Sequence, residues 1–292
     1  MRHGNAPAAI ILSHLDACDN QHPSGVIVET VMRMPSAMTA ALLALALTLS
    51  WSPSFAGTAK ADASAIAAAI ASPERPRCDR DRDVWAKPQT VLTLLGARPG
   101  MRVIDYLAGD GYYSELLARI VGPRGGVIVY NNDGYASYVG KELAERFQGR
   151  RVPNTLLKVA EIADLKLPAH SLDAALFVMS YHDVYYTPKG AKGPMGDAGQ
   201  MVGTLFNALK PGGVVVVQDH IATAGSSPAD SVDRMHRIDP EAVKHIFEQA
   251  GFKLNAQDDS FRNPGDDHSK LVFDPSIRHH TDQFLFRFRK PG

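Results

Sequence analysis

Residues 103–121, VIDYLAGDGYYSELLARIV, combine a short β-branched run, a glycine turn and a helix in one continuous stretch. Gly109 and Gly111 stand where the backbone can bend tightly and a ligand can approach closely. Apolar residues then recur at helical spacing until Gly122-Pro123, a typical helix end. A strand that feeds a glycine turn and a helix start exposes free backbone N–H groups, so the stretch is typical of a nucleotide site in an α/β fold.

The rest of the chain alternates between predicted strands and predicted helices. Most of the strands are apolar on both faces, as a parallel sheet covered by helices requires. Strands are predicted at 126–131, 156–159, 172–179, 214–217, 253–257 and 284–289, and helices at 138–147, 198–209 and 240–250. A chain of 292 residues, 45% of them apolar, is long enough for one large α/β domain.

The charge of the chain indicates what kind of partner it has. Its 31 basic and 31 acidic residues give a formal net charge of zero. A nucleic-acid-binding surface normally shows as a basic excess. We therefore expect a small-molecule partner and no nucleic acid, and nothing in the sequence favours a particular oligomeric state.

An apolar run near the N-terminus is typical of a secretory signal. It spans 38–51, which is short for crossing a bilayer, and it follows Arg33. Small residues suited to cleavage end at Ala56 and Ala61. We therefore expect a cleaved signal peptide at 32–61, a periplasmic or secreted protein, and no stable membrane insertion after cleavage. An uncut membrane anchor is the alternative.

The signal also suggests the boundaries of the mature chain. Signal peptides begin at the N-terminus, so we expect translation to start at Met32 or Met34 and residues 1–31 to be a non-native or disordered extension. Residues 62–95 are expected to form an N-terminal helical cover, and 96–292 the main domain. The cover contains the segment PERPRCDRDRD, in which Arg and Asp are nearly equal in number. Such a run favours a solvated face, although a cover over the nucleotide pocket is also open.

Three short stretches, in this order and in this strand and helix context, match a known family. They are Asp105–Gly111 (DYLAGDG), Leu209–Gly213 (LKPGG) and Ala250–Phe252 (AGF). Through them, residues 85–290 resemble the class I S-adenosylmethionine-dependent methyltransferases, and most of all a bacterial group of predicted methyltransferases with signal peptides. The resemblance implies S-adenosyl-L-methionine as cofactor. It also implies a Rossmann-like, doubly wound, mostly parallel sheet of seven strands, order 3-2-1-4-5-7-6, with the last strand antiparallel.

The resemblance also implies which residues hold the cofactor. They are Asp105, Ala108, Gly109, Gly111, Tyr112, Asn131, Glu161 and Ile162. Asn131 would hold the ribose hydroxyls, and Glu161, with Asp164 as a competing choice, the adenine amino group. Two positions depart from the family pattern, because Asn131 stands where an acid is usual and Leu107 where the first glycine is usual. An amide still accepts one hydrogen bond.

A nicotinamide dinucleotide site is the alternative for the same turn. Gly109 to Ser114 is one residue short of the G-x-G-x-x-G pattern. Ser114 stands in place of the third glycine, which close helix packing needs, and Asp105 interrupts the apolar strand. Both features favour the methyltransferase interpretation over an oxidoreductase.

Polar residues gather after the predicted strands at 172–179 and 214–217. His182 and Asp183 follow the first, and Asp219 and His220 the second. Ligands of an open parallel sheet lie outside the carboxyl ends of its strands. An alcohol, phenol or amine must lose a proton when it is methylated, so His182 and His220 are candidate bases, oriented by Asp183 or Asp219. We therefore expect methyl transfer to an oxygen or nitrogen of a small polar molecule.

Two other interpretations stay open. His182, Asp183, Asp219, His220 and His268 offer donors for a divalent metal, but they lack a compact ligand spacing, so no metal is expected. The unusual residues in the cofactor pattern also fit a binding protein that kept the fold with a degraded site.

Overall fold

The computed structural model describes residues 60–148 and 152–292. The predicted extension at 1–31 and all but the last two residues of the predicted signal peptide lie outside these residues. The described helices are α1 (Ala63–Ile70), α2 (Arg77–Ala86), α3 (Pro88–Leu95), α4 (Tyr112–Val121), α5 (Asp133–Phe147), α6 (Ala198–Ala208), α7 (Pro228–Met235) and α8 (Pro240–Gln249), with 3-10 turns η2 (Ile162–Asp164) and η3 (His182–Tyr185).

Seven strands form one sheet, and its topology confirms the predicted fold class. They are β1 (Arg102–Tyr106), β2 (Gly126–Asn131), β3 (Thr155–Val159), β4 (Leu172–Val178), β5 (Leu209–His220), β6 (Lys253–Asp258) and β7 (Gln283–Arg289). Their order is β3-β2-β1-β4-β5-β7-β6. The pairs from β3 to β5 are parallel, and β7 runs antiparallel to both β5 and β6.

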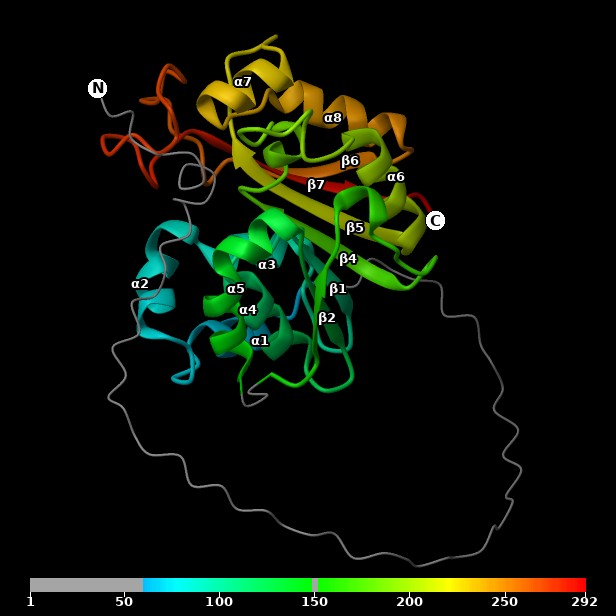
Figure 1. Cartoon of the computed structure of the whole chain (residues 1–292). Helices are drawn as coiled ribbons and strands as arrows, with labels where there is room; N and C mark the ends of the chain where they lie inside the picture. The colour runs from blue at the N-terminus through cyan, green and yellow to red at the C-terminus, as the bar shows by residue number, and fades with distance from the viewer. Residues whose placement is uncertain (1–59, 149–151) are drawn as a thin grey trace, which may run out of the picture. The chain divides into compact units, whose positions relative to one another are not determined.

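A hydrophobic core lies on each face of this sheet. Side chains alternate along β1, so Val103 belongs to the core built with α1, α3 and α4, and Ile104 to the core built with α6 and α8. Figure 1 shows these two groups of helices on opposite sides of the strands. Because both faces are covered, the central strands contain long apolar runs, which is why they could be recognised in the sequence.

The turn after β1 contains three left-handed residues. Leu107, Gly109 and Gly111 have φ values of 52°, 59° and 85°. Gly111 is the N-cap of α4, and a Cβ there would lie 2.9 Å from Phe147 Cε2 and 3.1 Å from Leu143 Cδ1 of α5. The left-handed backbone at this position favours glycine, and any Cβ would also push against the side chains of Phe147 and Leu143. Leu107 takes a left-handed conformation at the place where the family has glycine, at a steric cost.

Two elements differ in extent from their predictions. Helix α5 begins at Asp133, before the predicted 138, because the Asn132 side chain caps it by accepting a hydrogen bond from the Tyr135 N–H. Strand β5 begins at Leu209, before the predicted 214, because Leu209 already pairs with Leu172 across a register shift. Helix α7 was not predicted at all.

The N-terminal cover is helical, and its charged segment is solvated on one side only. Arg75 and Asp79 are each only 2% exposed. Arg75 donates to both carboxylate oxygens of Asp83, at 2.8 and 2.7 Å. The expectation of a solvated face holds in part, since the side chains of Arg77 and Asp81 are 89% and 73% exposed. Composition alone does not tell the helix side that faces water from the side that faces the rest of the fold.

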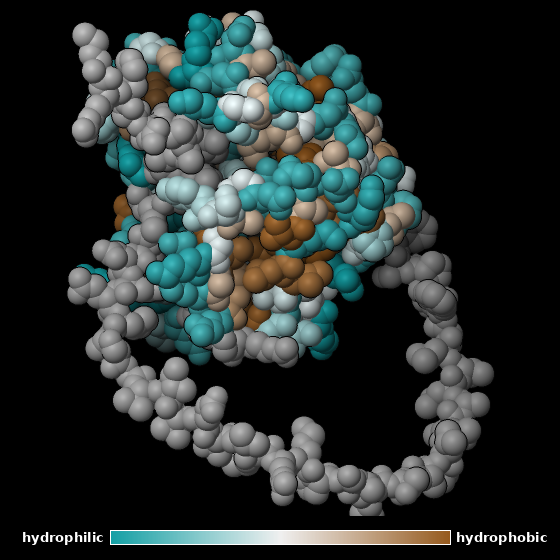
Figure 2. Space-filling model, in the orientation of Figure 1, coloured by the Kyte–Doolittle hydropathy of each residue, from teal (hydrophilic) through white to brown (hydrophobic). Residues whose placement is uncertain are grey.

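The surface offers two further observations. Among the described residues, no helix combines the length and hydropathy needed to cross a membrane. Figure 2 shows an apolar area among hydrophilic side chains on the visible face. Large apolar side chains are also exposed along the edge strand β3, where Leu156 and Val159 are 61% and 52% exposed.

Candidate functional site

The carboxyl ends of β1, β4 and β5 are neighbours in the middle of the sheet. A first hollow opens at the end of β1. It is lined by Arg82, Asp105, Leu107, Ala108, Gly109, Asp110, Tyr112, Tyr113, Tyr135, Val178, Met179 and Ser180. Four of the predicted cofactor residues are therefore brought together, namely Asp105, Ala108, Gly109 and Tyr112. A larger cavity of about 350 Å³, between the end of β5 and α8, contains none of the eight.

Asp105 is a buried carboxyl at the base of the first hollow. It is 3% exposed and accepts a hydrogen bond from the Ser114 hydroxyl. Burial raises the pKa of Asp105 to about 7, although the bond from Ser114 opposes the rise. The carboxyl can therefore switch between neutral and ionised forms near neutral pH, and a cationic ligand in the hollow would favour the ionised form.

Asn131, the last residue of β2, holds the glycine turn through both atoms of its amide. Its Oδ1 accepts from the Gly109 N–H at 3.0 Å, and its Nδ2 donates to the Gly109 carbonyl at 2.9 Å. The side chain is 1% exposed. The amide suits this task because it both donates and accepts, which an ionised carboxylate cannot do. The structure thus gives a reason for an asparagine where the family that the chain resembles usually has an acid. The predicted contact of Asn131 with the ribose stays a prediction.

Glu161 and Ile162 follow β3 and lie outside the lining of the first hollow. The Glu161 Oε1 accepts from the Asp133 N–H at 3.3 Å, which ties the end of β3 to the start of α5. Ile162 is 3% exposed and belongs to the core beside α6. Their predicted contacts with an adenine ring stay predictions.

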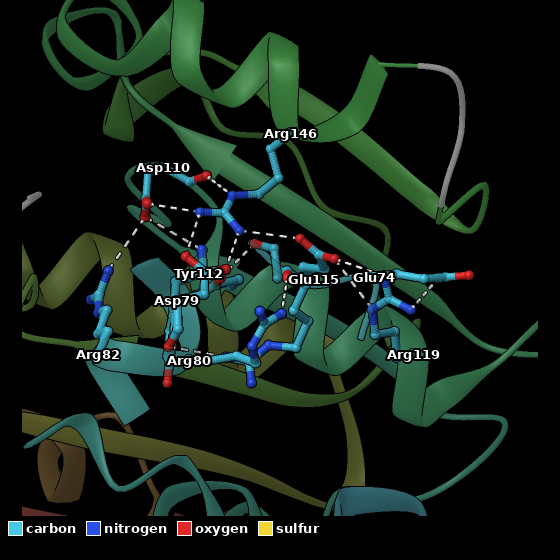
Figure 3. Close-up of polar contacts among 12 residues, drawn as sticks. Glu74, Asp79, Arg80, Arg82, Asp110, Tyr112, Glu115, Arg119 and Arg146 are labelled. Carbon is cyan, nitrogen blue, oxygen red and sulfur yellow. Dashed lines mark hydrogen bonds and ion pairs between the residues drawn. The ribbon is translucent and has the colours of Figure 1, made fainter. Parts of the chain in front are cut away.

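Arg146 of α5 supports the turn from behind, as Figure 3 shows. Its Nε donates to the Asp110 carbonyl at 2.6 Å, and its Nη2 pairs with the Asp110 carboxylate at 2.9 Å. The same guanidinium pairs with Asp79 of α2 and with Glu115 of α4. Burial alone would raise the pKa of Asp110, but Arg146 and Arg82 hold it below its usual range. One buried cation therefore joins α2, α4, α5 and the glycine turn.

Arg82 of α2 closes the first hollow from the side of the N-terminal cover. Its guanidinium carbon lies 4.3 Å from the centre of the Tyr112 ring and 5.1 Å from that of Trp85. Its Nη1 lies 3.6 Å from the Asp110 carboxylate. The Tyr113 hydroxyl also donates to the Ala86 carbonyl at 3.0 Å. The cover thus forms one wall of the site, which is the alternative left open from the sequence.

His182 lies at the end of β4 and is bonded to β5. Its Nδ1 lies 2.7 Å from Asp219 Oδ1, and its backbone N–H donates to Asp219 Oδ2 at 2.9 Å. The imidazole is buried, which disfavours its charge, but the carboxylates of Asp183 and Asp219 outweigh burial and raise the pKa of His182 to about 9. A raised pKa makes His182 a poorer base at neutral pH, and the residue is not among those that line the first hollow.

The other nitrogen of this ring belongs to a compact group. His182 Nε2 lies 3.3 Å from Asp183 Oδ1 and 3.4 Å from His236 Nδ1, and the last two atoms are 3.6 Å apart. The Tyr135 hydroxyl donates to Asp183 Oδ2. His236 was not a predicted site residue. Its role was missed because it is 54 positions from His182 and follows the unpredicted helix α7, where it takes a left-handed φ of 50°.

His220, the last residue of β5, borders a second hollow. The lining is mostly aromatic or basic and consists of Trp85, Met179, His220, Val272, Phe273, Arg278 and His279. Met179 lines both hollows, so the two are adjacent. The His220 Nδ1 lies 2.7 Å from the Thr281 hydroxyl, which orients its ring. His268 lies apart from this group, paired with Asp282 at 3.0 Å.

Comparisons with known proteins agree with the fold and identify distant relatives. No family model matches the chain. The ubiquinone/menaquinone biosynthesis C-methyltransferase UbiE of Vibrio campbellii (strain ATCC BAA-1116) is 26% identical over 188 residues, which are 64% of this chain and 61% of that protein. The corresponding Vibrio cholerae protein is 25% identical over the same shares. The chain therefore spans less than two thirds of the length of these curated relatives.

Solved structures with the same fold include methyltransferases. A methyltransferase dependent on that cofactor from Aquifex aeolicus is 18% identical, with a TM-score of 0.51 over 79% of this chain and 99% of that one. The phosphoethanolamine N-methyltransferase 2 of Haemonchus contortus, solved with S-adenosyl-L-methionine, is 16% identical, with a TM-score of 0.50 over 71% and 53%. The fold is thus that of the class I methyltransferases.

Proposed function

We propose that the chain is an S-adenosylmethionine-dependent methyltransferase that acts on a small molecule. The observation that carries the proposal is the first hollow, where Asp105, Gly109 and Tyr112 meet at the end of β1 in a class I methyltransferase fold. The buried carboxyl of Asp105 suits a cationic ligand. The distant similarity to a curated methyltransferase supports the same activity.

The acceptor is proposed to occupy the second hollow. The hollow holds only about 20 Å³ in this structure, so a bound acceptor would have to widen it. Its rings, among them Trp85 and Phe273, would then pack against an aromatic or otherwise flat molecule, and Met179 separates it from the first hollow. The bound cofactor supplies an electrophilic methyl group. His220 is the better of the two candidate bases, because it borders this hollow, whereas both nitrogens of His182 are directed at Asp219, Asp183 and His236. His220 would take the proton that an oxygen or nitrogen acceptor loses.

A carbon acceptor is the second candidate, because the curated relatives are named as C-methyltransferases. An activated carbon next to a phenol oxygen also loses a proton, so His220 would serve in the same way. Product analysis by mass spectrometry separates the two classes, since only O- or N-methylation removes a titratable or exchangeable proton from the acceptor's heteroatom.

The cofactor assignment is tested by ligand-induced stabilisation. We expect S-adenosylmethionine and S-adenosylhomocysteine at 100 times their Kd to stabilise the fold by about 2.7 kcal/mol and raise the melting temperature. A nicotinamide dinucleotide is the matched control, because it fits the alternative interpretation of the glycine turn. A rise with the dinucleotide alone would overturn the proposal in favour of an oxidoreductase, and a rise with none would favour a degraded site.

Cofactor affinity is expected to improve as pH rises from 6 to 8. Asp105 has a pKa of about 7, and its ionised form suits the cationic cofactor. If only that form binds, the affinity gains about tenfold over this range. The ligand-free fold shows the opposite sign, because a raised carboxyl pKa contributes stability that is present below the unfolded pKa of about 4 and is lost as pH rises through 7.

Calorimetric titration at several pH values measures this dependence. The Asp105→Asn variant is the control, since its amide cannot ionise, and its affinity should be lower and should lack the part of the pH dependence due to Asp105. An equal pH profile in wild type and variant would show that Asp105 is not the group that responds.

Export with signal cleavage remains part of the proposal. It rests on the apolar run at 38–51 and on the small residues that end at Ala56 and Ala61. We expect the chain expressed from Met32 in a Gram-negative host to appear in the periplasmic fraction with an N-terminus after Ala56 or Ala61. N-terminal sequencing of the purified protein decides this, and an intact N-terminus in the cytosolic fraction would rule export out.

A further inference from the structure

The buried group formed by His182, Asp183 and His236 has the form of a metal site. Each residue offers one donor atom, and the three donor atoms are separated by 3.3, 3.4 and 3.6 Å. We propose that these three side chains bind a divalent metal ion of the zinc type in a tetrahedral site. This inference is independent of whether the first hollow binds S-adenosylmethionine.

The spacing of the donors favours a tetrahedral over an octahedral ion. With metal–ligand distances of about 2.0–2.1 Å, the donors of a tetrahedral zinc site lie about 3.3–3.4 Å apart. Neighbouring donors of an octahedral ion at the same distances lie only about 2.8–3.0 Å apart. The observed separations of 3.3–3.6 Å match the tetrahedral case. Two imidazoles and one carboxylate are also a ligand set that zinc takes in enzymes.

The surroundings prepare two of the ligands for this task. With a proton on Nδ1 donated to Asp219, His182 presents the lone pair of Nε2 to the site. The carboxylate of Asp183 is held in the same manner, because its Oδ2 accepts from the Tyr135 hydroxyl and leaves Oδ1 facing the histidines. Such outer partners are the usual companions of metal-bound histidines and carboxylates.

Burial and charge also fit a cation. The three ligands and Asp219 are each no more than 1% exposed. Two buried carboxylates require compensation, which a divalent ion would supply while both histidines stay neutral. His236 packs against Phe273, and the rings of His182 and His220 are 6.0 Å apart between their centres. The ion would therefore lie beside the second hollow, with its fourth position available to a water or to an acceptor atom.

Metal analysis of the full chain, purified without a histidine tag, tests the proposal. We expect about one zinc per chain in wild type. After chelator treatment, Co²⁺ should bind at one equivalent with the intense visible absorption of a tetrahedral ion. His236→Ala should hold less than about a tenth of an ion per chain, and Asp183→Asn should bind Co²⁺ with a changed spectrum. His245→Ala is the matched control, because His245 is an exposed histidine of α8 and should leave both readouts unchanged.

If a variant fails to fold, Co²⁺ binding to the wild-type protein still tests the proposed metal site. Absence of Co²⁺ binding to the stripped wild type would overturn the proposal, and so would the weak absorption of an octahedral ion. A His236→Ala variant that folds and keeps the wild-type metal content and spectrum would place any bound ion elsewhere, and would also overturn it.

Discussion

Replacing Arg146 by methionine is expected to lower the free energy of unfolding by about 3–5 kcal/mol. The change removes the positive charge that pairs with Asp79, Asp110 and Glu115, all of which are at most 5% exposed. Glu115 keeps its pair with Arg119 and Asp110 keeps Arg82 at 3.6 Å, but all three buried carboxylates lose part of their compensation. Breaking a buried ion pair on one side costs more than the pair contributes when intact. Methionine keeps most of the volume, so loss of packing adds little. Chemical denaturation followed by circular dichroism measures the effect.

Two further variants separate the charge effect from a general effect of losing an arginine. Arg77→Met removes an arginine whose pair with Asp81 is exposed, with 89% of the Arg77 side chain accessible, and should change stability by no more than about 0.5 kcal/mol. Adding Asp79→Asn to Arg146→Met should restore part of the lost stability, because a buried carboxylate that has lost its pair with Arg146 is no longer charged. A loss below about 1 kcal/mol in Arg146→Met would show that this cluster does not hold α2 to the glycine turn.

Replacing His220 by alanine is expected to reduce turnover by a factor of about 10²–10⁴. His220 borders the second hollow at the end of β5, where it can accept the proton that the acceptor loses. The first hollow does not include this residue, so the Kd for S-adenosylmethionine should stay within about twofold of wild type. Formation of S-adenosylhomocysteine, with an acceptor from a screen of small phenols, alcohols and amines, measures turnover.

The controls for this experiment are chosen to isolate the imidazole. His245→Ala should leave turnover unchanged, because His245 lies on the exposed side of α8. Thr281→Val should reduce turnover less than His220→Ala, since it removes only the hydroxyl that orients the ring. Wild-type turnover in His220→Ala would show that the acceptor either needs no base at this position or binds elsewhere.

The fold could be predicted because its signals are local. Apolar runs such as 126–131 and 172–179 are buried on both faces, so their strand character shows in the sequence itself. The glycine turn could be predicted for a similar reason. The left-handed backbone at Gly111 favours glycine, and a side chain there would come close to Phe147. Resemblance to the class I methyltransferases supplied the strand order, which these local patterns alone do not determine.

The electrostatic parts of the site could not be predicted, because they join residues distant in the sequence. Asp79 and Arg146 are 67 positions apart, and their pairing places one side of the charged N-terminal segment inside the protein. The role of the Asn131 amide likewise depends on contacts with a residue distant in the sequence, since its oxygen and nitrogen both bond to the backbone of Gly109. Composition identified these residues as polar, but not which of them lie inside the protein.

The most direct test of the central assignment is calorimetric titration of the full chain with S-adenosylmethionine and with S-adenosylhomocysteine. We expect each to bind at one site per chain with micromolar affinity, and a nicotinamide dinucleotide not to bind. Gly111→Val should abolish the heat of binding, because a β-branched residue fits neither the left-handed backbone nor the space beside Phe147. Binding of the dinucleotide alone, or of none of the three ligands to a folded wild-type chain, would contradict the assignment of the first hollow as a methyltransferase cofactor site.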